Sequence, residues 1–580
     1  MPNRPTYSHK THGGTAYRLI VLTAMAVVVG AIVSVAVLGF VEAVRHLNDI
    51  LFISHRTRVA LFDTPFLLAA ITVLVPTLGG ALVGWLLKRF SSEQRPLGPA
   101  DIIATVQLRS KPPKTRDGVV STLAALLSLG FGASVGQYGP TAYIGSIVGS
   151  VVAKFSFRIP NLQAIAVACG VAAAISTAFN APLAGLVFAH EVILRHYSLQ
   201  AFAPVTVAAA TGYIFANLIF KHEPLFIVEF SGVQYTHEFF IFALTGIACA
   251  FLACAYMHSL LRCSKFATAL PINQIWRPAL AGLAVGVVAL QLPDVLGIGS
   301  EALRFATIEG SFGSVELFVL ILAKLALTVV CVGFGFAGGV FSPSLLIGIL
   351  TGALFWQMLE VFGIPNSGVE VYAICAMMSL TSPVIGAPLT TILIVFELTR
   401  NYDLTIATMV GVVFANLLSY RMFGRSLFDV QLAAKGINLA HGRERALLEN
   451  KLLVDLPHSD LLTIEDDQTC EQVKLHLINS ERAEAVVVND DNQYQAMVRL
   501  QDVVLTSASL TQVMRGNWLS FNEKTSLWGA MQALHGFIGE GVPIVSTTNQ
   551  ELIGVVTEAD IIAAYLATVH DLRAEENESV

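Results

Sequence analysis

The sequence predicts a mostly α-helical membrane protein that ends in a soluble α/β region, and three observations support this fold class. Hydrophobic residues make up 54% of the 580 residues and charged residues only 13%, which is too apolar for an ordinary soluble protein. Several apolar runs approach or exceed the roughly 20 residues that cross a hydrocarbon core. Two Gly-rich motifs recur in the same order, which indicates a duplicated membrane domain.

The first expected elements are a short tail and a series of membrane spans. Residues 1–16 are polar and include Arg4 and Lys10, which predicts a cytoplasmic N-terminal tail. The apolar run that follows has no small-residue cleavage site, so we expect a retained first span rather than a signal peptide. Shorter Gly-rich stretches such as 140–154 predict partial or re-entrant helices. The long apolar runs are 17–43, 65–87, 202–220, 238–257 and 315–333.

The membrane region repeats itself along the chain. Gly130-Phe131-Gly132 matches Gly333-Phe334-Gly335 at an offset of 203 residues, and further Gly and Pro residues keep this offset. Later, the stretch 180–192 parallels 386–398 at an offset of 206 residues. Two halves that each hold a broken helix at matching positions predict inverted repeats, with a transport site between them near the bilayer midplane.

Both repeats contain a helix start that is suited to an anion. A Gly-rich stretch leads into a helix whose first turn holds a proline, Pro140 in one repeat and Pro343 in the other. Glycines let the backbone approach a ligand closely. The first N–H groups of a helix lack intrahelical partners and carry the positive end of its dipole. Two such starts that face one point would hold an anion weakly, and weak binding suits permeation.

Other functions find less support in the residues. The glycines could instead serve close helix packing. A cation pathway would need convergent carboxylates, but the acids of the membrane region are scattered. No nucleophile, metal or acid–base constellation indicates an enzyme, the seven cysteines show no metal spacing, and no basic stripe indicates nucleic acid. The scattered acids are Glu42, Asp101, Glu191 and Glu397.

Two motifs resemble those of the CLC family of chloride channels and transporters. The stretch 339–343, GVFSP, fits the family's GxFxP motif, and 136–140, GQYGP, fits its G(K/R)EGP motif except at Gln137 and Tyr138. The resemblance covers nearly the whole chain. Since no organelle presequence is found, we expect the inner membrane of a prokaryote, and the resemblance implies a homodimer with one pore in each subunit. It also implies a chloride path lined by backbone N–H groups, at Gly136, Gln137, Tyr138 and Gly139 in one repeat and at Gly339, Val340 and Phe341 in the other.

The largest departure from the family concerns protons. The family's gating glutamate is replaced by Tyr138, and its inner proton-carrying glutamate aligns with Val192, next to Glu191. A phenol with an ordinary pKa of about 10 stays neutral near pH 7, and valine carries no proton. Tyr138 is therefore expected to be a neutral gate, or else an aromatic residue that merely packs. His190 could titrate near neutral pH, although a lone helical histidine is more often a packing residue.

A second departure concerns side-chain hydroxyls. Phe428 lies where the resemblance implies a chloride-contacting tyrosine, and Leu97 with Gly98 lies where it implies a serine-bearing GSGIP motif. Both hydroxyls expected at the central site are absent, so the preference among chloride, nitrate and other anions stays open.

The C-terminal region reads as two similar α/β modules, each a strand, turn, strand and helix, which resemble a pair of CBS domains. Thr557 and Asp560 match positions that contact adenine nucleotides in that family, whereas the first module has Arg499 and Asp502. The alternative is a structural pairing surface for a dimer. The expected divisions are a membrane domain at 17–440 with repeats at about 17–220 and 237–430, a linker at 441–455, and modules at 456–515 and 516–575.

The sequence therefore predicts a dimeric, passive chloride channel with cytoplasmic N-terminus and CBS domains. The alternative is a proton-coupled anion exchanger with a rewired proton path. No metal or required cofactor is expected. Chloride is the transported ion, and an adenine nucleotide is a possible ligand of the tail.

Overall fold

The computed structural model describes residues 12–61, 63–110, 113–155, 161–220, 232–456, 458, 462–504, 509–516 and 518–577. Most of the tail predicted at 1–16 lies outside these residues. The chain forms two compact units, the first ending at Lys435 and the second beginning at Gly436. Each unit is described by itself below.

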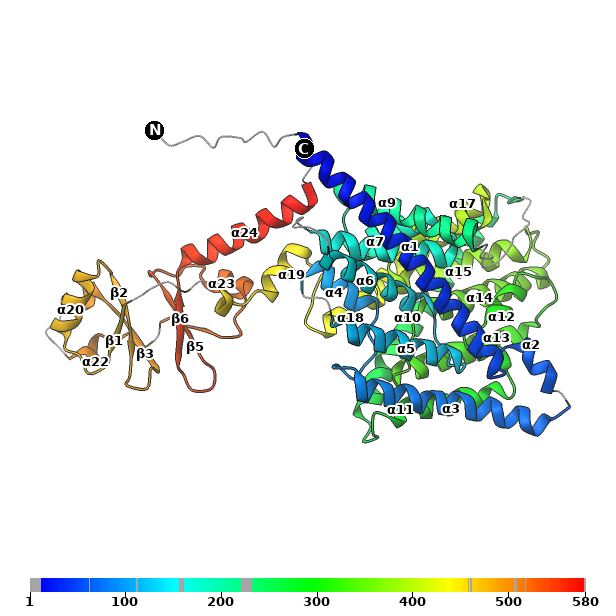
Figure 1. Ribbon diagram of the computed structural model, residues 1–580, viewed down its shortest axis with the longest axis horizontal. Helices are drawn as coiled ribbons and strands as arrows, with labels where there is room; N and C mark the ends of the chain where they lie inside the picture. The colour runs from blue at the N-terminus through cyan, green and yellow to red at the C-terminus, as the bar shows by residue number, and fades with distance from the viewer. Residues whose placement is uncertain are drawn as a thin grey trace. The chain divides into compact units, whose positions relative to one another are not determined.

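The first unit is a bundle of helices (Figure 1). Within the described residues, eight helices are long and apolar enough to cross a membrane, and they include all five of the long apolar runs of the sequence. The elements are α1 (His12–Ile50), α2 (His55–Arg58), η1 (Val59–Leu61), α3 (Pro65–Phe90), α4 (Pro99–Gln107), α5 (Thr115–Gly130), α6 (Tyr138–Phe155), α7 (Leu162–Phe179), α8 (Pro182–Phe188), η2 (Ala189–Leu194), α9 (Leu199–Tyr213), η3 (Ile214–Ile219), α10 (Glu238–Ala269), α11 (Trp276–Ala289), η4 (Pro293–Val295), α12 (Ser300–Phe305), α13 (Ser314–Gly333), α14 (Phe341–Val361), α15 (Val369–Ile385), α16 (Pro388–Thr399), α17 (Tyr402–Met422) and α18 (Leu427–Ala434).

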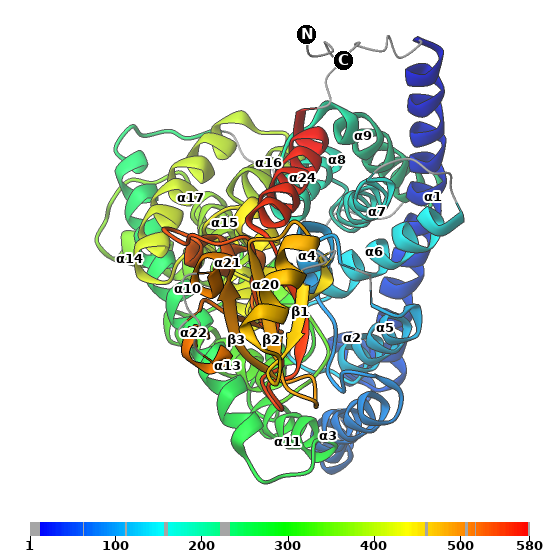
Figure 2. The same ribbon diagram turned by 90° about the vertical axis from the view of Figure 1, so that its left-hand side faces the viewer.

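Equivalent helices of the two repeats pack in the same way. Helix α6 lies against α7, and α14 lies against α15 (Figures 1 and 2). A Cβ atom on Gly149 would lie 2.1 Å from the carbonyl oxygen of Ala166, and one on Gly352 would lie 2.1 Å from that of Tyr372. No side chain fits at such distances, so each helix pair needs a glycine there. Gly149 and Gly352 are equivalent residues, because they lie 203 residues apart.

Two glutamates show that the repeats are related by a twofold axis. The Glu191 carboxylate accepts hydrogen bonds from the N–H groups of Leu389 (3.0 Å) and Thr390 (2.9 Å) at the start of α16. Its counterpart Glu397 accepts from Leu183 (2.9 Å) and Ala184 (2.8 Å) at the start of α8. Glu191 therefore caps the start of α16, and Glu397 caps the start of α8, which is the equivalent helix of the first repeat. Such reciprocal contacts are what a twofold relation between the halves produces.

The second unit contains two sheets with the same topology. The strand order is β1-β2-β3 in one and β4-β5-β6 in the other, and each has one parallel and one antiparallel pair. The elements are α19 (Arg443–Asn450), η5 (Leu453–Asp455), β1 (Leu462–Glu465), α20 (Cys470–Asn479), β2 (Glu484–Val488), β3 (Tyr494–Arg499), α21 (Leu500–Val504), α22 (Leu510–Val513), β4 (Phe521–Asn522), α23 (Leu527–Ala533), β5 (Val542–Val545), β6 (Leu552–Val556) and α24 (Glu558–Asn577).

The segment expected to be a linker, 441–455, is part of this second unit's core. It carries α19 and η5, and Leu448 and Leu453 are fully buried in the same cluster as Phe521 and Val542. Leu448 and Leu453 are apolar, and an exposed linker would leave their side chains in water, so the segment packs them into this core.

Candidate functional site

The two Gly-rich stretches meet at their glycines. The N–H group of Gly136 donates to the carbonyl oxygen of Gly339 at 2.7 Å, and the N–H group of Gly339 donates back to Gly136 at 2.7 Å. This is an isolated antiparallel bridge between equivalent residues of the two repeats. A Cβ atom on Gly136 would lie only 2.8 Å from the Gly339 carbonyl oxygen, so the close approach requires glycine. The bridge brings the starts of α6 and α14 together.

Several N–H groups at these helix starts have no protein partner. The N–H group of Gln137 donates to the Ser342 hydroxyl at 3.1 Å. Among the described residues, none accepts a hydrogen bond from the N–H groups of Tyr138, Gly139, Val340 or Phe341. They are the unpaired donors that the first turn of each helix leaves over.

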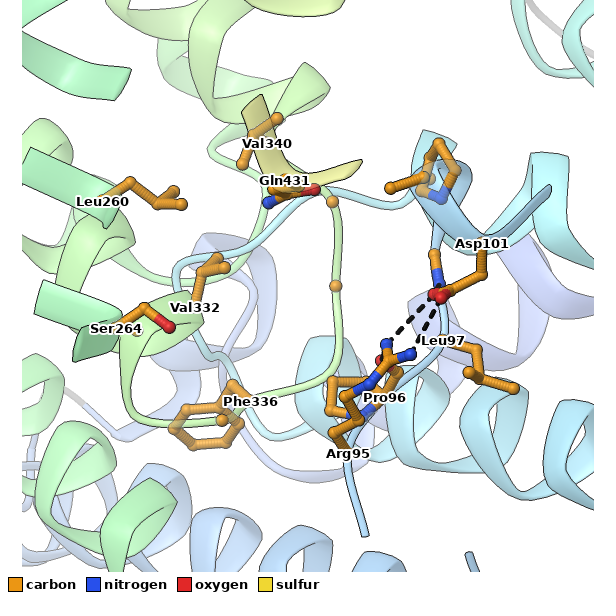
Figure 3. A pocket seen from close by; sticks show the side chains of 18 of the residues that line it. Arg95, Pro96, Leu97, Asp101, Leu260, Ser264, Val332, Phe336, Val340 and Gln431 are labelled. Carbon is orange, nitrogen blue, oxygen red and sulfur yellow. Dashed lines mark hydrogen bonds and ion pairs between the residues drawn. The ribbon is translucent and has the colours of Figure 1, made fainter. Parts of the chain in front are cut away.

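A cavity of about 480 Å³ extends from these helix starts (Figure 3). Its walls come from both Gly-rich stretches and from α4, α10 and α18, and it includes Lys435, the last residue of the membrane unit. Most of its accessible wall is apolar. Of the ten residues predicted for the path, eight line the cavity, namely Leu97, Gly98, Tyr138, Gly139, Gly339, Val340, Phe341 and Phe428. Gly136 and Gln137 are not among its lining residues.

Tyr138 lies in an aromatic cluster at the cavity. Its ring stacks on Phe179 with 3.9 Å between ring centroids, and it meets the edge of Phe341 at 5.3 Å. The Tyr138 side chain is 2% exposed. Tyr138 and Phe341 are themselves equivalent in the duplication, because each is the first residue of its helix at the 203-residue offset. Phe179 was missed from sequence, since no spacing rule places the end of α7 against the start of α6.

The N–H groups at the start of α4 are already used within the protein. Leu97 N–H donates to the Ser121 hydroxyl at 3.1 Å, and Gly98 N–H donates to the Asp101 carboxylate at 2.9 Å. The predicted residues Leu97 and Gly98 therefore border the cavity, but they contribute no N–H group to it.

Three charged residues at the cavity form one network, while Arg277 donates to backbone carbonyl oxygens and Lys265 has no side-chain partner among the described residues. The Arg95 guanidinium forms two hydrogen bonds with the Asp101 carboxylate, at 3.1 and 2.9 Å (Figure 3). The Lys435 ammonium lies 2.6 Å from the same carboxylate. Among the cavity's lining residues Asp101 is the only carboxylate, and two cations hold it.

The predicted proton-path positions lie away from the cavity. Val192 is buried in η2, and neither it nor Glu191 is among the residues lining the cavity. The Glu191 carboxylate caps α16 and also accepts a hydrogen bond from the Thr390 hydroxyl at 2.7 Å. The neighbouring His190 ring is buried and bonds through Nδ1 to the carbonyl oxygen of His196 at 2.8 Å.

In the C-terminal unit, which is called the C-terminal tail below, the side chains of Thr557 and Asp560 bind each other. The Thr557 N–H and hydroxyl groups donate to Asp560 Oδ2 at 2.9 and 2.7 Å, and the Asp560 N–H group donates to Thr557 Oγ1 at 3.1 Å. This reciprocal arrangement caps the start of α24. In the first module the corresponding Arg499 and Asp502 are bound instead by Glu484 and Arg515.

Within the part of the chain that the structure describes, no group of three or more His, Cys, Asp or Glu residues is placed to hold a metal ion.

Comparisons with known proteins agree with this architecture. A family model described as voltage gated chloride channel matches residues 79–420, and one described as CBS domain matches residues 510–567. The voltage-gated ClC-type chloride channel ClcB of Escherichia coli O81 (strain ED1a) is 27% identical over 421 residues, which cover 70% of this chain and 97% of that protein.

Two solved structures are similar as well. The crystal structure of a slow cyanobacterial Cl-/H+ antiporter is 25% identical with a TM-score of 0.64, covering 71% of this chain and 97% of its own. A eukaryotic CLC transporter is 18% identical with a TM-score of 0.60, covering 93% of this chain and 98% of its own.

The fold and the paired helix starts define a multi-pass membrane protein of the anion-transporting class. The chain belongs to the voltage gated chloride channel family, the CLC family, and its C-terminal region carries a CBS domain. The predicted family and fold class are confirmed.

Proposed function

We propose that this protein is a passive chloride channel. The observation that carries the proposal is the chemistry of the path: the first side chain of α6 is the neutral Tyr138, and the one carboxylate among the cavity's lining residues, Asp101, is held by Arg95 and Lys435. An exchanger needs a group that alternately binds and releases a proton in the path. Unpaired N–H groups can hold chloride without any such group, and no enzymatic step is involved.

Tyr138 is the gate in this proposal. Its ring fills space between Phe179 and Phe341 at the point where the unpaired N–H groups converge. Conduction would require the ring to leave the stack, which costs about 1 kcal/mol for an aromatic pair in addition to the buried apolar area that the ring loses.

A proton-coupled exchanger is the second candidate. The similarity to the cyanobacterial Cl-/H+ antiporter favours it. Protons would then need a route that avoids Val192, and Glu191 would have to exchange its three hydrogen bonds at α16 for a proton.

Flux through liposomes separates the two functions. Liposomes that contain the purified protein are loaded with potassium chloride, and chloride release is started with valinomycin, which removes the membrane potential. A channel releases chloride with no proton movement beyond that of protein-free liposomes, as followed with a pH-sensitive dye. Proton movement against its gradient, driven by chloride, would contradict the channel.

The role of Tyr138 is tested by Tyr138→Glu. The new carboxylate is charged above its ordinary pKa of about 4.3 and then competes with chloride for the N–H groups. We therefore expect block at pH 7 that is relieved as the pH falls towards 4, whereas Tyr138→Phe should conduct without this pH dependence. Equal conduction of Tyr138→Glu from pH 4 to 8 would show that residue 138 does not line the path.

We also propose a homodimer with one pore in each subunit. Large apolar side chains are exposed on equivalent helices of the two repeats, including Leu183 on α8, Leu389 on α16 and Leu417 on α17. Lipid is the other possible cover for this face. In detergent, the protein is expected to have the mass of two 62.1 kDa chains, and a single-chain mass would contradict the dimer.

The N-terminus and the tail are proposed to face the cytoplasm of a prokaryotic inner membrane. Basic residues in 1–16 and the bacterial origin of the similar ClcB channel support this orientation. Protease should cleave the tail in inverted vesicles and spare it in intact spheroplasts.

An adenine nucleotide is proposed as a ligand of the tail at Thr557 and Asp560. The support is a hydroxyl and a carboxylate held 2.7 Å apart at the start of α24, where the positive end of the helix dipole favours a phosphate. Asp560→Asn keeps an oxygen that can cap the helix but removes the charge. ATP binding, followed by calorimetry, should weaken in this variant while the thermal unfolding temperature changes little. Equal ATP binding would assign the pair to capping alone.

A further inference from the structure

Gln431 lines the cavity from α18, one helical turn beyond Phe428. Residues three or four apart share a helix face, and Leu427, Phe428, Gln431 and Ala434 together form the α18 wall of the cavity. Gln431 and Val340 both line the cavity, and among the described residues none accepts a hydrogen bond from the Val340 N–H group (Figure 3). The side chain is partly buried.

The amide of Gln431 has no hydrogen-bond partner among the described residues. Other polar side chains of the cavity are engaged: Arg95 and Lys435 bind Asp101, and Gln274 binds the carbonyl oxygen of Gln94. Ser264 and Lys265 also lack a described partner, but they belong to α10, a different wall.

The other α18 residues that line the cavity are Leu427, Phe428 and Ala434, which are apolar and offer no side-chain hydrogen-bond donor. Gln431 is therefore the side-chain donor that α18 supplies to the cavity. A glutamine amide has two N–H donors and no net charge. It can therefore bind an anion weakly enough to release it.

We propose that the Gln431 amide nitrogen binds the permeating anion after it leaves, or before it reaches, the N–H groups at the helix starts. The anion is a halide or another small monovalent anion. This inference rests on the proposed anion conduction. It assigns to Gln431 the side-chain hydrogen bond that α18 donates to the anion.

The test compares three variants in the same chloride flux assay and in calorimetric titrations with bromide. Gln431→Leu keeps the volume and removes both donors, and we expect about tenfold weaker bromide binding, the usual effect of losing one hydrogen bond to an ion. Gln431→Glu should bind bromide more weakly still at pH 7 and recover as the pH falls towards 4. Gln291→Leu, the same change at an exposed residue outside the cavity, should match the unaltered protein.

A rescue experiment separates binding from folding. In Phe428→Tyr/Gln431→Leu, a hydroxyl one turn away on the same face supplies a donor, and bromide affinity should return most of the way. Bromide binding of Gln431→Leu equal to that of the unaltered protein overturns the inference, as does a loss that Phe428→Tyr leaves unrepaired.

The two proposals fail in different ways. If the unaltered protein does not conduct chloride, the proposed function fails, while the bromide titrations still decide whether Gln431 binds an anion. If the protein conducts and Gln431→Leu conducts and binds equally well, only the role of Gln431 is lost.

Discussion

The bridge between Gly136 and Gly339 is the contact on which the proposed anion site depends. Two hydrogen bonds of 2.7 Å join equivalent residues of the two repeats, and they consume the N–H groups of the glycines themselves. Beyond the bridge, each chain turns at once into a helix whose first N–H groups are left over. A side chain at either glycine would push the two starts apart. The same contact therefore joins the two repeats and brings together the helix starts that carry the unpaired donors.

Unpaired N–H groups in an apolar environment are costly, and each costs about 1–3 kcal/mol when nothing satisfies it. The four at Tyr138, Gly139, Val340 and Phe341 converge on one cavity, where an anion would satisfy several at once. The full charges of the cavity are arranged differently. Arg95 and Lys435 both bind Asp101 through short contacts, while Lys265 and Arg277 line the cavity outside this network.

Sequence reasoning found the parts of this site that the duplication repeats. The 203-residue offset matched Gly136 with Gly339, and the structure joins these residues directly. It missed contacts made between elements that no repeat or motif relates, such as the stacking of Phe179 on Tyr138. It also placed Leu97 and Gly98 along the path, and they line the cavity, but Ser121 and Asp101 accept their N–H groups. A sequence pattern tells which backbone N–H groups a helix start leaves unpaired within the helix. Only the folded structure shows which nearby side chains accept hydrogen bonds from them. For the same reason Glu191, considered for proton transfer, proved to cap a helix of the other repeat.

The duplication also explains why the proposed gate, Tyr138, meets a second aromatic ring. Tyr138 and Phe341 are equivalent residues, so folding places an aromatic ring at the start of both helices, and the centroids of the two rings lie 5.3 Å apart. Aromatic rings are negative on their faces and positive at their edges. The stack with Phe179 covers a face of Tyr138, and a ring that swings out of the stack can turn an edge towards the anion. Tyr138 and Phe341 then differ by a single hydroxyl group, which gives Tyr138 one hydrogen-bond donor that Phe341 lacks.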